Sequence, residues 1–555
     1  MEPFVLLDDA LAGSATLLTA LQSVDLVGLD SIDSSLRAGW SRGWHCFARL
    51  PYTGNAALFW FAHRFAVDPD AFLPSTPAGL IDAAHDVTAD EFAAGIQTVK
   101  EAIAAGTCYQ VNYTHRVHAT VSGDPRALYR RLRERQPVAF GVLAHLPEPA
   151  AAWTLSLSPE LFLDVRDGLA TSRPMKGTAP IESDPSALRD DPKNRAENLM
   201  IVDLLRNDLS QVADDVSVPA LFEVEAVGRL WQMTSTVTGR LRPDVGLGDL
   251  LRATFPCGSI TGAPKLASMR IIDGVERDER GLYTGSLGVI EDGRATLNIA
   301  IRTLEIDEAG RARLGIGSGV VADSTAESEW QECIAKAAFA TGLTPDVHLR
   351  EAIRVVDGVA PLAELHRRRL SRSSAALGIP LRTDPVADAI AQTPPGAWRV
   401  GIDVAPDGAS AVTHAPLTPT VEPVDVVIAP AAWSPTPWSI HKTTDRAHFD
   451  DATAFATRHG AFDAIGHTVD GVVLEGARTS VFARIDERWV TPPLDLGILD
   501  SVQRRAILDD PALIGADSIE EAAFTVDDLR RAESVIVANA VRGPLTARLK
   551  EIPSP

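Results

Sequence analysis

Two lysines in this sequence stand in settings that suit an amine nucleophile. Lys176 lies in the segment 173–178, which reads RPMKGT, and Lys442 lies in the segment 440–446, which reads IHKTTDR. A lysine becomes a nucleophile when its surroundings lower its pKa, so that it loses its proton near neutral pH. The proline and glycine around Lys176 predict a constrained turn that aims the amine into a cleft. On spacing alone, a solvated loop lysine is the simpler interpretation.

Four glutamates could supply acid–base and metal chemistry. Glu160 follows a Ser-Pro dipeptide, and Glu197 comes near the start of a predicted helix, where the helix dipole favours a carboxylate. Glu329 and Glu332 are three residues apart and therefore share one helical face. Carboxylates offered from separate helices suit Mg²⁺, a hard ion that prefers oxygen ligands. A helix-start acid and a solvated acidic face are the structural alternatives.

Two glycine-rich stretches could bind anions. Residues 255–265 read FPCGSITGAPK, and residues 315–324 read GIGSGVVADS. We expect both to be turns, whose free backbone N–H groups could cradle carboxylates or phosphates. Neither stretch has the spacing of a Walker loop.

The elements that must position these residues are both helices and strands. Apolar periodicity predicts helices over 89–105, 193–209, 324–341, 361–377 and 501–508, and strands over 153–157, 285–290, 295–301, 424–428 and 534–538. In the second helix, the apolar stripe expected to face the core is Leu199, Val202, Leu205 and Leu209. This mixture predicts an α+β fold.

Proline-bearing segments predict where the chain divides. The segment 344–346 follows a long helical pattern, so we expect one domain over residues 1–343 and another over 347–555. The segment 417–423 is expected to separate two lobes of the second domain. The length of 555 residues is ample for two large domains with their own cores.

Composition excludes several classes of function. The chain has 74 acidic and 52 basic residues, a net charge of −22, which disfavours a nucleic-acid binder. The four cysteines make no CxxC pair, so neither a zinc site nor a disulfide framework is expected. The sequence contains no run of about 18 apolar residues, so no membrane span is expected. Acidic residues stand where a signal peptide would be basic, so a cytoplasmic location is expected.

The segments 196–208 and 255–265 and the Glu-x-x-Glu at 329–332 together resemble the chorismate-utilising enzymes over residues 1–343. The lysine motif Pro-Met-Lys-Gly-Thr is similar to the Pro-Ile-Lys-Gly-Thr of the aminodeoxychorismate synthases in this family. Anthranilate synthases have a small residue at the lysine position. The resemblance implies a two-layered β sandwich flanked by helices, and the amination of chorismate to 4-amino-4-deoxychorismate.

The resemblance also implies roles for individual residues. Lys176 would attack C2 of chorismate while the 4-hydroxyl departs, with Glu160 as the general acid. Glu197 and Glu332 would hold Mg²⁺ on the ring carboxylate, with Glu329 behind them. The residues matched to substrate binding are Thr261, Tyr283, Arg302, Gly317 and Gly319.

Gln110 stands where water-using relatives carry a lysine base, and therefore indicates a nitrogen nucleophile. We find no Gly-x-Cys-x-Gly turn of a glutamine amidotransferase in the sequence. A separate glutamine amidotransferase subunit is therefore expected to supply ammonia, with free ammonium as a substitute.

The segment 366–378, which reads HRRRLSRSSAALG, resembles the fold-type IV pyridoxal phosphate enzymes, best the 4-amino-4-deoxychorismate lyases, over residues 347–555. The resemblance implies a two-lobed domain that binds pyridoxal 5'-phosphate and forms a homodimer. Lys442 would be the lysine that bonds to the cofactor. The residues matched to the cofactor phosphate are Arg369, Val502 and Gln503. Glu475 is matched to the ring nitrogen.

Together the two resemblances predict a bifunctional enzyme of 4-aminobenzoate synthesis. The first half would aminate chorismate and the second would eliminate pyruvate from the product. One rival is an anthranilate synthase component I with an appended transaminase, although its Leu-Leu-Glu-Ser motif is replaced by LLDD at 6–9. A second rival makes the C-terminal half a non-catalytic module, and a third makes it an amino-acid transaminase.

Overall fold

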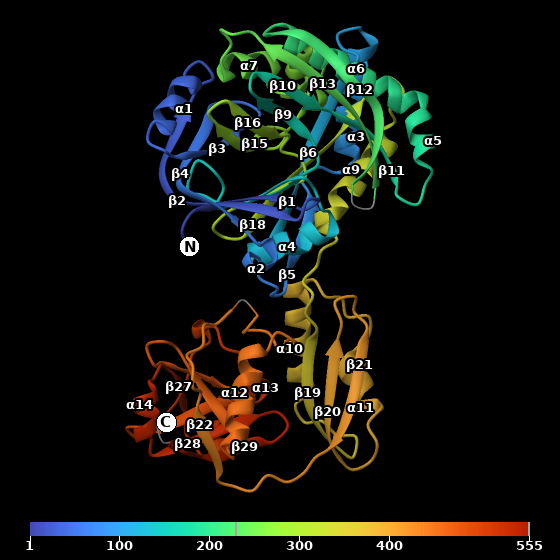
Figure 1. Ribbon diagram of the computed structural model, residues 1–555. Helices are drawn as coiled ribbons and strands as arrows, with labels where there is room; N and C mark the ends of the chain where they lie inside the picture. Colours follow the sequence, from blue (N-terminus) through green and yellow to red (C-terminus); the bar gives the residue numbers. More distant parts are fainter. Residues whose placement is uncertain (228–229, 437, 553–555) are drawn as a thin grey trace. The chain divides into compact units, whose positions relative to one another are not determined.

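The structure is a computed structural model that describes residues 1–227, 230–436 and 438–552 (Figure 1). It divides into two compact units, Met1–Leu343 and Thr344–Pro555. Both units contain helices as well as strands, which confirms the predicted α+β class. No helix in these described ranges is long and apolar enough to cross a membrane.

The strands of the first unit form one hydrogen-bonded network. Their pairings are antiparallel, as for β6 with β18 and β2 with β4. The strands are β1 (Phe4–Asp9), β2 (Ser14–Val27), β3 (His45–Leu50), β4 (Ala56–Val67), β5 (Ala78–His85), β6 (Gln110–Gly123), β7 (Phe140–His145), β8 (Trp153–Ser158), β9 (Leu161–Arg166), β10 (Leu169–Arg173), β11 (Met175–Pro180), β12 (Ala213–Val227), β13 (Leu230–Leu241), β14 (Gly262–Ala263), β15 (Ser286–Glu291), β16 (Arg294–Asn298), β17 (Thr303–Ile306) and β18 (Arg311–Val320).

Several helices of the first unit begin at sequence-encoded caps. Thr88 makes a capping box with Glu91, and Asp124, Asp184 and Asp191 each precede a proline and accept a backbone N–H. The helices are α1 (Ile32–Trp40), α2 (Pro69–Phe72), α3 (Ala89–Ala104), α4 (Pro125–Arg135), α5 (Pro185–Asp190), α6 (Pro192–Ser210), α7 (Leu247–Thr254), α8 (Lys265–Val275) and α9 (Ala326–Thr341).

Helix α6 packs on β12 and β13, and its buried face differs from the predicted stripe. Val202, Leu205 and Leu209 are buried as expected, but Leu199 is 45% exposed. Asn198 takes the inward position instead, because its side-chain oxygen accepts a hydrogen bond from the Ser235 hydroxyl at 2.6 Å. A polar residue with a buried partner is therefore placed inward, where apolar periodicity alone predicted a leucine.

The second unit contains two separate sheets. The first is antiparallel, carries helices α10 (Ala363–Leu377) and α11 (Pro385–Ala391), and consists of β19 (Leu349–Val356), β20 (Ala397–Val404) and β21 (Ser410–Pro416). The second is mixed and runs in the order β24 (Val473–Gly476), β23 (Asp463–His467), β22 (Val424–Ile428), β29 (Gly543–Leu549), β28 (Ser534–Asn539), β25 (Ser480–Ile485), β26 (Arg488–Thr491), β27 (Ile519–Glu521). Its helices are α12 (Ala447–Arg458), α13 (Val502–Asp509) and α14 (Val526–Arg531). The proline-bearing segment 417–423 lies between the two sheets along the chain.

Candidate active sites in the two units

Lys176 lies in a strand rather than in the turn predicted from its neighbours. It belongs to β11, whose register with β13 shifts between Met175 and Thr178, so the strand bulges at the lysine. Gly177 has a φ of +81°, which glycine tolerates without strain. The bulge re-aims the lysine side chain, as bulges do near functional sites.

The amine of Lys176 and the amide of Gln110, at the start of β6, both approach a third predicted site residue, Gly319 on β18. A Cβ atom placed on Gly319 would lie 2.5 Å from Nε2 of Gln110 and 3.5 Å from Nζ of Lys176. The stretch 315–320 is part of strand β18 and not the predicted turn. It pairs in register with β6, and its glycines keep the strand surface clear for neighbouring side chains.

Electrostatics favours a neutral Lys176. Burial lowers the pKa of this amine, and the charge of Lys336 lowers it further, while Glu197, Glu160 and Glu332 act in the opposite direction. Nζ makes no hydrogen bond or ion pair with any residue that the structure describes. A partly buried amine without a partner is suited to attack an electrophile.

Glu160 lies buried between β8 and β9. The hydroxyl of Ser259 donates a hydrogen bond to its Oε1 at 2.9 Å. Burial raises the pKa of this carboxyl, whereas Ser259, Lys176, the Met175 N–H and Lys336 lower it. A carboxyl with a raised pKa beside a lysine fits the predicted general acid.

The segment 258–263 is joined to β6 by short backbone contacts. Strand β14 pairs with the start of β6, and the N–H of Asn112 donates to the carbonyl of Thr261 at 2.8 Å. Thr261 is buried, and its hydroxyl donates to the carbonyl of Cys257 at 3.1 Å. Its predicted contact with substrate stays a prediction.

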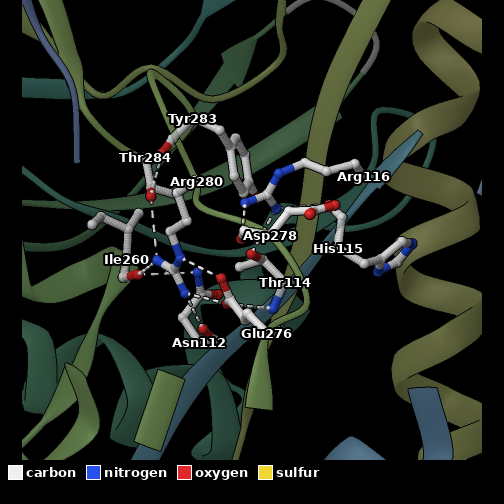
Figure 2. A network of polar contacts seen from close by, with 10 residues as sticks. All are labelled: Asn112, Thr114, His115, Arg116, Ile260, Glu276, Asp278, Arg280, Tyr283 and Thr284. Atoms are coloured by element: carbon white, nitrogen blue, oxygen red, sulfur yellow. Dashed lines mark hydrogen bonds and ion pairs between the residues drawn. The ribbon is translucent and has the colours of Figure 1, made fainter. Parts of the chain in front are cut away.

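A buried guanidinium ties the site segments together. Arg280 donates to the carbonyls of Ile260 at 2.8 Å and Asn112 at 2.6 Å, and to the hydroxyl of Thr284 at 3.2 Å (Figure 2). Glu276 balances its charge at 2.7 Å. The segments beside Thr261, Gln110 and Tyr283 therefore share one anchor.

Tyr283 and Arg302 are two of the residues matched to carboxylate binding. Tyr283 is buried against Gly315, where a Cβ atom would lie 2.0 Å from its ring, and Arg116 stacks on it at 5.4 Å. Burial lowers the pKa of Arg302 to about 10. Its guanidinium makes no hydrogen bond or ion pair within the described part of the chain, so it is free to accept an anion.

The three carboxylates predicted to surround Mg²⁺ differ in their settings. Glu329 is buried, Glu197 is partly buried, and Glu332 is exposed and pairs with Lys336 at 2.7 Å. Across the described ranges, no group of three or more acidic, histidine or cysteine side chains is close enough to hold a metal ion. Mg²⁺ is commonly held by one or two carboxylates together with substrate and water. Glu197 and Glu332, which both raise the pKa of Lys176, are the two carboxylates that fit this kind of Mg²⁺ coordination.

The second unit brings Lys442 and Glu475 into one electrostatic cluster. Burial, followed by repulsion from Arg369 and Arg446, lowers the pKa of Lys442 to about 7. Burial raises the pKa of Glu475 to about 7, although the Leu499 N–H donates to its Oε1 at 3.0 Å. An amine and a carboxyl that titrate near neutrality fit an aldehyde-binding lysine and the partner of a ring nitrogen.

The predicted phosphate ligands lie on α10 and at the start of α13. Arg369 is buried and makes a two-bond ion pair with Glu351. The Ser501 hydroxyl caps α13 by accepting the N–H of Arg504 at 3.2 Å. The N–H groups of Val502 and Gln503 have no acceptor among the described residues. This donor set of a guanidinium and a helix N-terminus fits a phosphate.

Two cavities of the first unit lie away from these residues. One has a volume of about 360 Å³ and is lined by residues of β1, β2, β4, β7, β9, β15 and β16, including Asp9, Arg64 and Arg294. The other, of about 110 Å³, is lined by His115 and Arg116. Neither cavity includes Lys176.

Two protein families match this chain, one in each half. The family described as chorismate binding enzyme matches residues 62–342, half of the chain, and the family described as amino-transferase class IV matches residues 348–548. The chain belongs to the chorismate binding enzyme family. Both resemblances drawn from the sequence are thereby confirmed at the level of the family.

Two curated relatives are similar to the chorismate binding enzyme half. Aminodeoxychorismate synthase component 1 of Klebsiella aerogenes is 41% identical over 261 residues, which cover 45% of this chain and 57% of that protein. An anthranilate synthase component 1 of Haloarcula marismortui is 42% identical over 262 residues, which cover 45% of this chain and 53% of that protein. The chain therefore spans little more than half the length of either relative.

A solved structure supports the fold. The menaquinone-specific isochorismate synthase of Escherichia coli has a TM-score of 0.52 at 18% identity and covers 60% of this chain and 87% of its own. This likeness shows the chorismate binding enzyme fold for the first unit.

Sequence reasoning missed three residues beside the candidate sites. They are Ser259 against Glu160, Arg280 at the centre of the network, and Glu351 beneath Arg369. Ser259 lies in the glycine-rich segment 255–265, but serine, arginine and glutamate are ordinary surface residues, so their types gave no sign of these roles. Their burial in the folded chain is what identifies them.

Proposed function

We propose that the chain aminates chorismate to 4-amino-4-deoxychorismate in its first unit and eliminates pyruvate from that product in its second, which gives 4-aminobenzoate. The observation that carries the first activity is the partly buried amine of Lys176, which approaches Gly319, as the amide of Gln110 also does, and whose pKa is raised by Glu160 among other carboxylates. Because the product would be 4-aminobenzoate, we propose that the chain serves folate supply.

The first reaction proceeds in two displacements. Nζ of Lys176 bonds to C2 of chorismate, both ring double bonds shift by one position, and the C4–O bond breaks. Glu160 gives its proton to the departing oxygen, which leaves as water. Ammonia then bonds to C4 and the C2–N bond breaks, which frees the lysine. Gln110 cannot deprotonate water, so nitrogen is the nucleophile that succeeds.

The remaining residues hold the dianionic substrate. Arg302, whose guanidinium is without a protein partner in the described ranges, and Tyr283 would bind the enolpyruvyl carboxylate, together with the strand backbone at Gly317 and Gly319. Glu197 and Glu332 would hold Mg²⁺, which neutralises the ring carboxylate, with Glu329 behind them. Thr261 would line the same space.

In the second unit, Arg369 and the N–H groups of Val502 and Gln503 would hold the phosphate of pyridoxal 5'-phosphate, and Glu475 its ring nitrogen. When bound, this cofactor supplies an electron sink for a carbanion. Lys442, whose pKa is about 7, would take the proton from C4 of the substrate. Loss of that proton and cleavage of the enolpyruvyl C–O bond aromatise the ring and release pyruvate.

The competing function is anthranilate synthesis, which the similar identity to an anthranilate synthase component 1 supports. Lys176 favours amination at C4, because a covalent displacement needs an amine at this position.

We also propose that a separate glutamine amidotransferase subunit supplies the ammonia, that the chain works in the cytoplasm, and that it pairs as a homodimer through the second unit.

One assay tests both halves. The purified chain is incubated with chorismate, ammonium, Mg²⁺ and pyridoxal 5'-phosphate, and the products are identified by mass. We expect 4-aminobenzoate and pyruvate, with Lys176→Ala making neither. Lys442→Ala should stop at 4-amino-4-deoxychorismate. Anthranilate from the native chain would reject the proposal, and native chain that stops at 4-amino-4-deoxychorismate would make the second unit a non-catalytic module or a transaminase.

A further inference from the structure

Ser259 is a buried serine whose hydroxyl points at the carboxyl of Glu160. Its Oγ lies 2.9 Å from Oε1 of Glu160 and 3.3 Å from Sγ of Cys257. The serine is 5% exposed and the glutamate 6% exposed. The contact joins residues 99 positions apart, so it is a product of the fold and not of a local turn.

The direction of these hydrogen bonds follows from the three groups. Burial raises the pKa of Cys257 to about 11, so the thiol keeps its hydrogen at neutral pH and can donate it to Oγ of Ser259. The single hydrogen of the serine then goes to Oε1 of Glu160. Accepting this hydrogen bond favours the carbonyl form at Oε1, so in the protonated carboxyl the hydrogen is favoured on Oε2.

We propose that Ser259 is a positioning residue that holds Oε1 of Glu160 and so presents the protonated Oε2 to the departing 4-hydroxyl group. This inference rests on the proposed function. In the step concerned, Nζ of Lys176 bonds to C2, the C4–O bond breaks, and the proton of Glu160 passes to the leaving oxygen to make water. Ser259 gives up no proton. It fixes the rotation of the carboxyl group and stabilises the anion that remains.

The charged and titratable groups that face Glu160 come from separate elements. Lys176 faces it from β11, Lys336 from α9 and Cys257 from the segment before Ser259. The two lysines and the Met175 N–H lower the pKa of Glu160 together with Ser259, against burial, which raises it. Removing the serine hydroxyl therefore raises the pKa of Glu160.

The test measures formation of the covalent adduct on Lys176 by intact mass, with chorismate and Mg²⁺ but no ammonium, from pH 5 to pH 9. We expect Ser259→Ala to lower the maximal rate about 10-fold, the low end of what general acid catalysis contributes. One limb of its pH profile should also move to higher pH, whichever limb reports Glu160. Ser259→Thr, which keeps the hydroxyl, should restore both.

Ser286→Ala is the matched control. Ser286 is a buried serine of β15 whose hydroxyl has no partner within the described ranges, so its loss should change neither rate nor profile. A Ser259→Ala profile with unmoved limbs, whatever the rate, would overturn the inference, as would Ser259→Thr that behaves like Ser259→Ala. The Glu160→Gln variant distinguishes failure of the proposed function from failure of the role inferred for Ser259. Unimpaired adduct formation in that variant would refute the proposed chemistry itself, whereas an inactive Glu160→Gln beside a native-like Ser259→Ala refutes only the role of Ser259.

Discussion

Arg369 and Glu351 form a two-bond ion pair inside the second unit, with Nε 2.9 Å from Oε1 and Nη2 2.6 Å from Oε2. His366 adds a third contact to the carboxylate at 2.6 Å. Burial alone would raise the pKa of Glu351, but the charge of Arg369 and the hydrogen bonds from His366 and Arg369 lower it to about 2. The arginine proposed to hold a phosphate is therefore oriented by its own counter-ion.

Glu351→Gln should destabilise the second unit. Breaking a buried ion pair on one side leaves an uncompensated charge and costs about 3–5 kcal/mol. We expect faster hydrogen exchange in β19 and α10 at neutral pH. Because the folded pKa lies below the ordinary value of 4.5, this stabilisation is present above about pH 4.5 and is lost as the pH falls toward 2. Glu364→Gln, on the exposed face of α10, is the control and should leave exchange unchanged.

The reactivity of Lys442 should rise with pH through about 7, the pKa of its amine. Its rate of bonding to pyridoxal 5'-phosphate is measured by borohydride trapping and intact mass. Glu475 raises the pKa of Lys442 and Arg446 lowers it. Glu475→Gln should therefore move the midpoint to lower pH and Arg446→Gln should move it to higher pH. Shifts in the same direction for both variants would contradict the charge cluster.

Gly319→Ala should remove most of the amination activity while the fold persists. The added methyl group would lie 2.5 Å from Nε2 of Gln110, so this amide must move, and it would also contact the Lys176 amine at 3.5 Å. Misplacement of a side chain in a catalytic site by about 1 Å can lower the rate ~100-fold. Product formation from chorismate and ammonium measures the effect. Gly274→Ala in α8, where a Cβ atom meets nothing within 4 Å, should keep full activity.

Lys336 and Glu332 should tune the Lys176 amine in opposite directions. Lys336 lowers its pKa and Glu332 raises it. Competitive acetylation of Lys176 across pH, read by peptide mass in the absence of Mg²⁺, reports this pKa directly. We expect the midpoint to rise in Lys336→Met and to fall in Glu332→Gln. Identical midpoints in the two variants would show that neither charge reaches the amine.

Helix positions could be predicted because their signals are local. The helices expected over 193–209 and 324–341 lie within about two residues of α6 and α9, since an apolar period and a cap suffice to define them. Residues 315–320 of the glycine stretch 315–324 were predicted wrongly as a turn. Glycine has no side chain to express a period, so only the pairing of β18 with β6 reveals the strand.

The sequence by itself determined the α+β class and the two families, because these depend on motifs and periods that survive in one dimension. It also singled out Lys176 and Lys442 by residue type. Only the tertiary structure decided which groups surround these amines, as with Ser259 beside Glu160 and Glu351 beneath Arg369. Burial and charge set the pKa of an amine, and both depend on contacts between segments that lie far apart in the chain.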